Sequence, residues 1–218
     1  MHVAAGAVAK ALLAEIGVAV AGRPVEIGGA TGDDEMRKAT DAARHDRDTL
    51  GGIVEVVATG VPPGLGSYAT PGERLDGRLA AALMRIQGVK AVEIGDGLAL
   101  ARRRGSEAHD EIEPGLRRRS NRAGGIEAGV SNGEPVVIRA AMKPLPTLMR
   151  PLASVDLATG EAGEALVERS DVQAVEALAV VTEAAVAWEL ARSAKDKFGG
   201  DALGDFVAAH SAYLARIA

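Results

Sequence analysis

Cysteine is absent from the 218-residue sequence, and aromatic side chains make up only 2% of it. Without cysteine the chain has no disulfide bond, no thiol nucleophile and no thiolate metal site. The hydrophobic fraction is nevertheless 47%, so Ala, Val, Leu and Ile must form most of the core, beside 27 glycines that permit close backbone packing. A chain of this length can bury such a core as one large domain or two small ones.

Long apolar runs are also lacking, because no stretch reaches the roughly 18 uninterrupted apolar residues of a membrane span. Residues 1–5 show no basic segment leading into an apolar one, so we expect a cytoplasmic protein. The net charge of −5 argues against a general nucleic-acid partner. Arginines cluster at residues 102–104 and 117–119, where they either bind a small anion or, as charge runs usually do, face solvent.

The hydrophobic pattern predicts alternating helices and strands, which is typical of an α/β protein. A strand over residues 53–58 is apolar on both faces, so we expect both faces to be buried. The opening helix has no visible N-cap, which suggests that the chain starts inside a helix. Helices are expected over residues 3–16, 34–48, 73–87 and 174–195 and after residue 200, strands over residues 18–21, 25–27, 53–58, 89–94 and 135–142, and mainly loop over residues 101–133.

Taken singly, the possible site motifs are weak. The histidines at 45, 109 and 210 are too scattered for a helical metal pair, so we expect no metal. The glycines of residues 124–129 lack the GxGxxG spacing of a dinucleotide fingerprint. Asn132-Gly133 is most simply a hairpin turn, and Asp171, just before a helix, is most simply its N-cap.

Several segments together, and in the same order, resemble the chorismate synthase family. They are GGIVEVVATGVPPGLGS (51–67), ERLDGRLAAALMRIQGVKAVEIGDG (73–97), GSEAHDEI (105–112), RSNRAGGIEAGVSNGEPVVIRAAMKPLPTL (119–148) and RSDVQAV (169–175). The resemblance identifies residues 1–218 as the C-terminal portion of a chorismate synthase domain. It implies an α/β fold, the family's β-α-β sandwich, in incomplete form.

The resemblance also implies a chemistry, that of a carbon–oxygen lyase of the shikimate pathway. Family members eliminate phosphate from 5-enolpyruvylshikimate 3-phosphate to give chorismate, a precursor of the aromatic amino acids. They require reduced FMN although the reaction is redox-neutral, and they assemble as homotetramers. The implied partners are therefore this phosphorylated substrate, FMN and further copies of the chain, with no nucleic acid and no membrane.

The family's flavin-contacting segments correspond to short stretches of this sequence. A lysine, an arginine and backbone amides freed by glycine and proline turns suit a phosphate or an electron-rich ring. Asp171 matches the family's aspartate near flavin N5, where a carboxylate can relay a proton. The residues implied to bind the cofactor are Gln87, Gly88, Ala128, Gly129, Lys143, Pro144, Leu145, Pro146, Thr147 and Arg169, and the catalytic residue implied is Asp171.

Departures from the family pattern lower the expected activity. Ala128 stands where the family usually has glycine, and its methyl group would crowd the flavin if the position needs a positive φ. The family's GESHG-like and RPGHAD-like segments, each with a catalytic histidine, do not occur. We therefore expect no turnover from this chain alone, and self-association through the nearly all-apolar helix around residues 174–190. The alternative is a non-catalytic fragment that oligomerises or binds flavin.

Overall fold

A four-stranded antiparallel sheet organises the protein, which we describe from a computed structural model covering residues 2–115 and 117–217. The strand order is β1-β2-β6-β3, and two small hairpins, β4-β5 and β7-β8, lie outside this sheet. The strands are β1 (Ala19–Ile27), β2 (Gly52–Thr59), β3 (Val89–Ile94), β4 (Ile126–Glu127), β5 (Val130–Ser131), β6 (Val136–Met142), β7 (Ala153–Val155) and β8 (Ala162–Glu164). The α-helices are α1 (His2–Ala14), α2 (Asp33–His45), α3 (Leu75–Met84), α4 (Gly105–Ala108), α5 (Val175–Phe198) and α6 (Leu203–Ile217), with 3₁₀ turns at Pro71–Glu73 and Gly97–Arg102.

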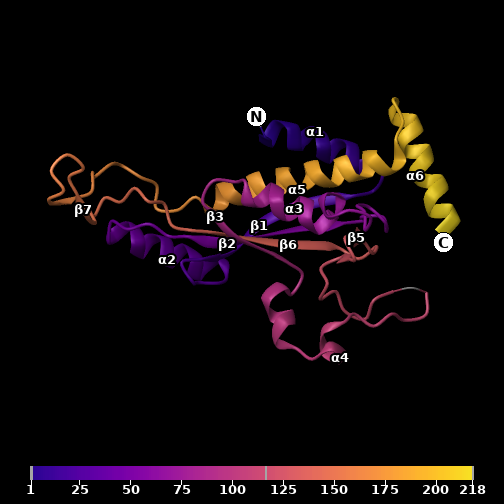
Figure 1. The fold of residues 1–218 in the computed structure, drawn as a ribbon, viewed down its shortest axis with the longest axis horizontal. Coiled ribbons are helices and arrows are strands. Elements are labelled where there is room, and N and C mark those ends of the chain that lie inside the picture. Colours follow the sequence, from indigo (N-terminus) through magenta and orange to yellow (C-terminus); the bar gives the residue numbers. More distant parts are fainter. Residues whose placement is uncertain (1, 116, 218) are drawn as a thin grey trace.

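Helices α1, α3 and α5 cover one face of the sheet, while α2 and the segment carrying α4 lie on the other side (Figure 1). The covered face carries alternate residues of the two central strands, Val54 and Val56 on β2 and Val136 and Ile138 on β6, all less than 2% exposed. The period-2 alternation of a strand places these side chains together against the helices. This single layer of contact forms most of the core, as its Ala, Val, Leu and Ile content predicts.

Small residues let α5 approach its neighbours closely. A Cβ added to Gly6 of α1 would lie 2.4 Å from the Ala184 Cβ, so the two helices touch where Gly6 has no side chain. Gly22 of β1 sits under α5 in the same way, and its N–H donates to Glu183 Oε2 at 2.7 Å. Glu183 also accepts a hydrogen bond from Lys10 Nζ at 2.5 Å. One α5 carboxylate therefore joins α1, α5 and β1.

The structure confirms most expected elements and corrects several. Residues 19–27 form one strand rather than two. The chain passes Pro24 through a register shift at the free edge of the sheet, where proline's missing N–H breaks no ladder bond. The expected helix over residues 73–87 is shorter, since a 3₁₀ turn precedes α3. Residues 53–58 are fully buried on one face only, because α2 and the α4 segment cover the other face incompletely (Figure 1), and Ile53 and Val57 there are half-exposed. That face is called the open face below.

The β4-β5 hairpin turns at Ala128-Gly129, and not at Asn132-Gly133 as the sequence suggested. Both turn residues have positive φ, 51° at Ala128 and 84° at Gly129, which is the geometry of a type I′ turn. Asn132-Gly133 instead connects β5 to β6. The Asn-Gly pair was a misleading signal, because the chain uses the tighter turn four residues earlier.

Candidate functional site

Several implied flavin residues gather at the end of the sheet where Gly52, Val89 and Met142 pair, called here the Met142 end. Lys143 follows β6 directly, and its N–H donates to the Gly88 carbonyl at 3.0 Å. Gly88 has a φ of 85°, a left-handed conformation that glycine adopts without strain. The Gln87-Gly88 turn and the Lys143–Thr147 segment are therefore held side by side by the backbone.

The segment before β2 links this group to the start of α5. Thr49 Oγ1 donates to the Leu145 carbonyl at 2.7 Å, and the Leu50 N–H donates to the Val172 carbonyl at 2.7 Å. Gly51 packs against the Lys143-Pro144 backbone, where an added Cβ would lie 2.3 Å from the Met142 carbonyl oxygen. Three segments far apart in sequence thus converge at one place.

A cavity of about 560 Å³ opens beside these segments. Its volume lies in the range of small-molecule sites. Three guanidinium groups and two carboxylates line it, so it suits an anionic ligand that also meets an acid–base group. The lining residues are Thr40, Arg44, Arg47, Asp48, Thr49, Met149, Arg169, Ser170, Asp171, Val172 and Gln173.

Arg47, which the sequence analysis did not select, occupies a strained position in this wall. It follows α2 with a φ of 58°, and the Asp48 N–H donates back to the Ala43 carbonyl at 2.9 Å, which closes the helix end. Glycine is the usual residue there, and a side chain in this conformation costs about 1–2 kcal/mol. No sequence signal marks this position, because the left-handed φ of Arg47 is set by how the chain leaves α2.

Asp171 is not the cap of α5, so that interpretation was wrong. The helix begins at Val175, and the Val175 N–H donates to Gln173 Oε1 at 2.5 Å. Gln173 performs the role expected of Asp171, while Asp171 lines the cavity beside Arg169. Asp171 thus forms part of the cavity wall rather than the cap of α5.

Ala128 and Gly129, in contrast, are not brought to the Met142 end. Their hairpin, β4-β5, lies at the opposite end of the sheet, where β6 begins at Val136 (Figure 1). Gly129 accepts the Leu75 N–H at 2.8 Å, and Val130 bridges to Gly66. Because β2 and β6 run the length of the sheet, the implied flavin residues of one chain fall into two separate groups.

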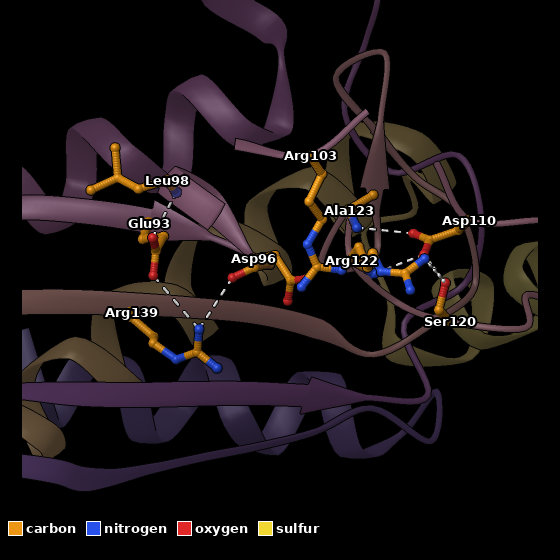
Figure 2. A network of polar contacts seen from close by, with 10 residues as sticks. Glu93, Asp96, Leu98, Arg103, Asp110, Ser120, Arg122, Ala123 and Arg139 are labelled. Atoms are coloured by element: carbon orange, nitrogen blue, oxygen red, sulfur yellow. Dashed lines mark hydrogen bonds and ion pairs between the residues drawn. The ribbon is translucent and has the colours of Figure 1, made fainter. Parts of the chain in front are cut away.

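Asp110 stabilises the loop that leads to this hairpin (Figure 2). Its carboxylate is only 8% exposed and accepts hydrogen bonds from Ser120 Oγ at 2.5 Å, the Arg122 N–H at 2.8 Å and the Ala123 N–H at 2.9 Å. Partial burial alone would raise the pKa of Asp110, but the three donors and the Arg122 charge outweigh it and hold the pKa below its usual value. The turn after it then places Asn121, whose Oδ1 accepts the Gly125 N–H at 2.7 Å.

Some arginines of the two clusters, among them Arg118, are paired with nearby acids. Arg103 pairs with Asp96 at 3.2 Å, and Arg119 contacts Glu111 at 2.5 Å and Glu113 at 3.1 Å. Within residues 2–115 and 117–217, no three His, Asp or Glu side chains gather in a way that would hold a metal ion. No helix in the same part of the chain is long and apolar enough to cross a membrane.

Comparison with known proteins agrees with this arrangement. A sequence model of the chorismate synthase family matches residues 1–194. The chain belongs to the chorismate synthase family. It is 50% identical over 220 residues to the chorismate synthase of Caldanaerobacter subterraneus subsp. tengcongensis, covering 99% of this chain and 63% of that protein. The chorismate synthase of Mycobacterium avium is 55% identical over 190 residues, covering 86% of this chain and 47% of that protein.

A solved chorismate synthase crystal structure superposes with a TM-score of 0.85 at 33% identity, covering 99% of this chain and 68% of that one. The mixed α/β architecture expected from the resemblance is therefore confirmed. The chain spans about 63% of the length of the Caldanaerobacter chorismate synthase. The family's activity, cofactor and assembly are accordingly treated below as proposals for this chain.

Proposed function

We propose that this chain forms the flavin-side part of a chorismate synthase, which eliminates phosphate from 5-enolpyruvylshikimate 3-phosphate with reduced FMN. The observation that carries the proposal is the cavity at the Met142 end, where Arg44, Arg47 and Arg169 converge with Asp171. The Lys143–Thr147 segment adjoins it through Thr49. Cationic side chains beside a carboxylate suit a site that binds phosphate and moves a proton.

The residues present fit a phosphorylated, anionic cofactor. Guanidinium groups form charge-assisted, often bidentate contacts with phosphate, and both Arg47 and Arg169 line the cavity. When bound, reduced FMN supplies electron density as phosphate leaves the substrate. Arg169 would hold the anion, and the Asp171 carboxylate would accept or return a proton at its Oδ atoms.

The second group of flavin residues, Ala128 and Gly129, bears on assembly. Since this hairpin lies at the opposite end of the sheet, a site that uses both groups must draw them from different copies of the chain. We therefore propose a homo-oligomer, in line with the tetramers of the family. The biosynthetic role of the family favours the cytoplasm as its location.

A non-catalytic, flavin-binding role is the second candidate. One observation favours this role when the chain is assayed without any other protein. No histidine lines the cavity within the part of the chain that the structure describes. Loss of a general acid–base group typically lowers rates by about 10²–10⁴-fold. We expect FMN binding without chorismate formation, and turnover above a no-protein control would exclude the non-catalytic role.

Titration of oxidised and reduced FMN, followed by flavin fluorescence, tests the proposed site. Arg169→Ala should weaken binding by about ten- to a hundredfold, because it removes a charge-assisted contact worth about 1.5–3 kcal/mol. Arg192→Ala is the matched control, since it removes an arginine of α5 that lies outside the cavity and is 58% exposed. Inorganic phosphate should compete with FMN in the wild type and compete less in Arg169→Ala.

His109→Ala separates this site from a second hollow of about 360 Å³, which is lined by His109, Arg119 and Arg122 among others. We expect this variant to bind FMN like the wild type. If Arg169→Ala binds FMN as well as the wild type while His109→Ala does not, the assignment of the flavin site to the Met142 end is wrong.

A further inference from the structure

The open face of the sheet carries a row of four charged residues that crosses all four strands. Arg23 on β1 lies opposite Glu55 on β2, Glu55 lies opposite Arg139 on β6, and Arg139 lies opposite Glu93 on β3. The corresponding ion pairs measure 3.1 Å, 2.8 Å and 3.6 Å. The row therefore reads plus, minus, plus, minus from one sheet edge to the other, and Figure 2 shows the Arg139–Glu93 contact.

Apolar residues flank this charged row on both sides. The same register places Ala21, Val57 and Val137 in the next row on the same face, and Ile53, Ala141 and Ala91 in the row on the other side, which Glu26 continues onto β1. These side chains are small or β-branched and half-buried or exposed. Small and β-branched side chains of this kind are suited to face-to-face packing with another sheet, whose spacing is about 10 Å.

The pairs within one chain do not use the outer charges fully. Arg23 is 73% exposed, and Glu93 is 31% exposed, whereas Glu55 at the centre is 11% exposed. Burial alone would raise the pKa of Glu55, but Arg139 and Arg23 outweigh that effect and keep the pKa below its usual value. The centre of the row is thus already neutralised, whereas Arg23 at one end is largely exposed and Glu93 at the other end, which also accepts the Leu98 N–H, is partly exposed.

We propose that a second copy of this chain docks on the open face, across a two-fold axis that runs parallel to the strands. Such a rotation reverses the order of the row, so that Arg23 faces the partner's Glu93 and Glu55 faces the partner's Arg139. Every charge then meets its opposite, and the two outer contacts occur twice because the interface is isologous. Each apolar row meets the same row of the partner, because this rotation preserves the position of a row along the strands.

The charges exclude the other in-plane axis. A two-fold axis perpendicular to the strands preserves the order of the row, so Arg23 would face Arg23 and Glu93 would face Glu93 of the two copies. Like charges brought together at an interface cost several kcal/mol. The inference adds a surface and an axis to the proposed assembly, and it does not depend on flavin binding at the Met142 end.

A charge-reversal cycle on Arg23 and Glu93 tests this interface. Within one chain the two residues lie three strand spacings apart, about 14 Å, which exceeds the roughly 8 Å Debye length at physiological salt. We expect Arg23→Glu and Glu93→Arg each to weaken self-association about tenfold or more in sedimentation or light scattering, and the double variant to restore it to within about threefold.

The same double variant separates association from a purely internal role of the row. Each reversal places like charges opposite Glu55 or Arg139 inside the chain, and combining them does not relieve either clash. The thermal stability of the dissociated double variant should therefore stay as low as the sum of the two single effects, even while association recovers. Binding of inorganic phosphate to the cavity lined by Arg47 and Arg169, which lies within one chain, should be unchanged in all variants, so failure of the interface is distinguishable from failure of the flavin site.

Three results would overturn the proposal: a wild-type chain that stays monomeric, association that neither reversal weakens, or a double variant that does not recover. Glu93 Oε1 also accepts the Leu98 N–H at 2.8 Å, so its reversal can impair folding. If the charge-reversed variants do not fold, the same cycle is carried out with the neutral substitutions Arg23→Gln and Glu93→Gln. The coupling between these two changes should appear in the dimerisation constant, and its absence would equally refute the interface.

Discussion

Replacement of Asp110 by asparagine is the sharpest test of how the β4-β5 hairpin is positioned. Asp110 Oδ1 accepts from Ser120 Oγ and the Arg122 N–H, and Oδ2 accepts from the Ala123 N–H. An asparagine whose oxygen takes the Oδ1 position turns its NH₂ group toward the Ala123 N–H. One charge-assisted hydrogen bond, worth about 1.5–3 kcal/mol, is then lost, and the others become neutral.

We therefore expect Asp110→Asn to lower the stability of residues 110–125 by about 2–4 kcal/mol at pH 7. Because the pKa of Asp110 is lowered in the folded protein, its contribution is complete above the unfolded pKa of about 4 and disappears as the pH falls through the folded pKa. The difference between wild type and variant should consequently shrink below about pH 4.

Hydrogen exchange of the Arg122 and Ala123 amides measures this local stability, and urea unfolding at pH 7 and in acid measures any global part. Glu111→Gln is the matched control, since the Glu111–Arg119 pair is about two-thirds exposed and such pairs contribute about 0–1 kcal/mol. Equal effects of the two substitutions would refute the reasoning. So would a wild-type advantage over Asp110→Asn that persists unchanged at low pH.

Three further substitutions test the packing and the backbone, each by urea or thermal unfolding. Ala128→Gly should stabilise the chain by about 0.5–1 kcal/mol, because it relieves a positive φ in the type I′ turn; a loss of stability would argue against that turn. Gly6→Ala should destabilise it by about 1–3 kcal/mol through the clash with Ala184, whereas Gly204→Ala, with no atom within 4 Å, should not; similar effects would contradict the close contact between α1 and α5. Burial lowers the pKa of His210, so the neutral imidazole contributes stability above about pH 6.5, and this contribution is lost as the pH falls. His210→Leu should therefore flatten the dependence of stability on pH between pH 7 and 5. An unchanged slope would show that another group titrates in this range.

The sequence by itself determined the local elements and the family. The Ala-rich, nearly all-apolar run around residues 174–195 predicted α5, and the prolines after the strand over 135–142 predicted where β6 ends. These features depend on neighbouring residues, so they can be inferred without knowing the rest of the fold. The motif order likewise identified chorismate synthase, which the comparisons support.

Only the tertiary structure decided which faces and segments meet. The pattern of β2 is apolar on both faces, yet one face packs on helices and the other stays open, because burial depends on what the rest of the chain places there. The implied flavin residues separated into two groups for the same reason, since their distance is set by the sheet and not by their spacing in sequence. Arg47 and the charged row from Arg23 to Glu93 were equally invisible, because strand register and a helix end bring distant residues into one site.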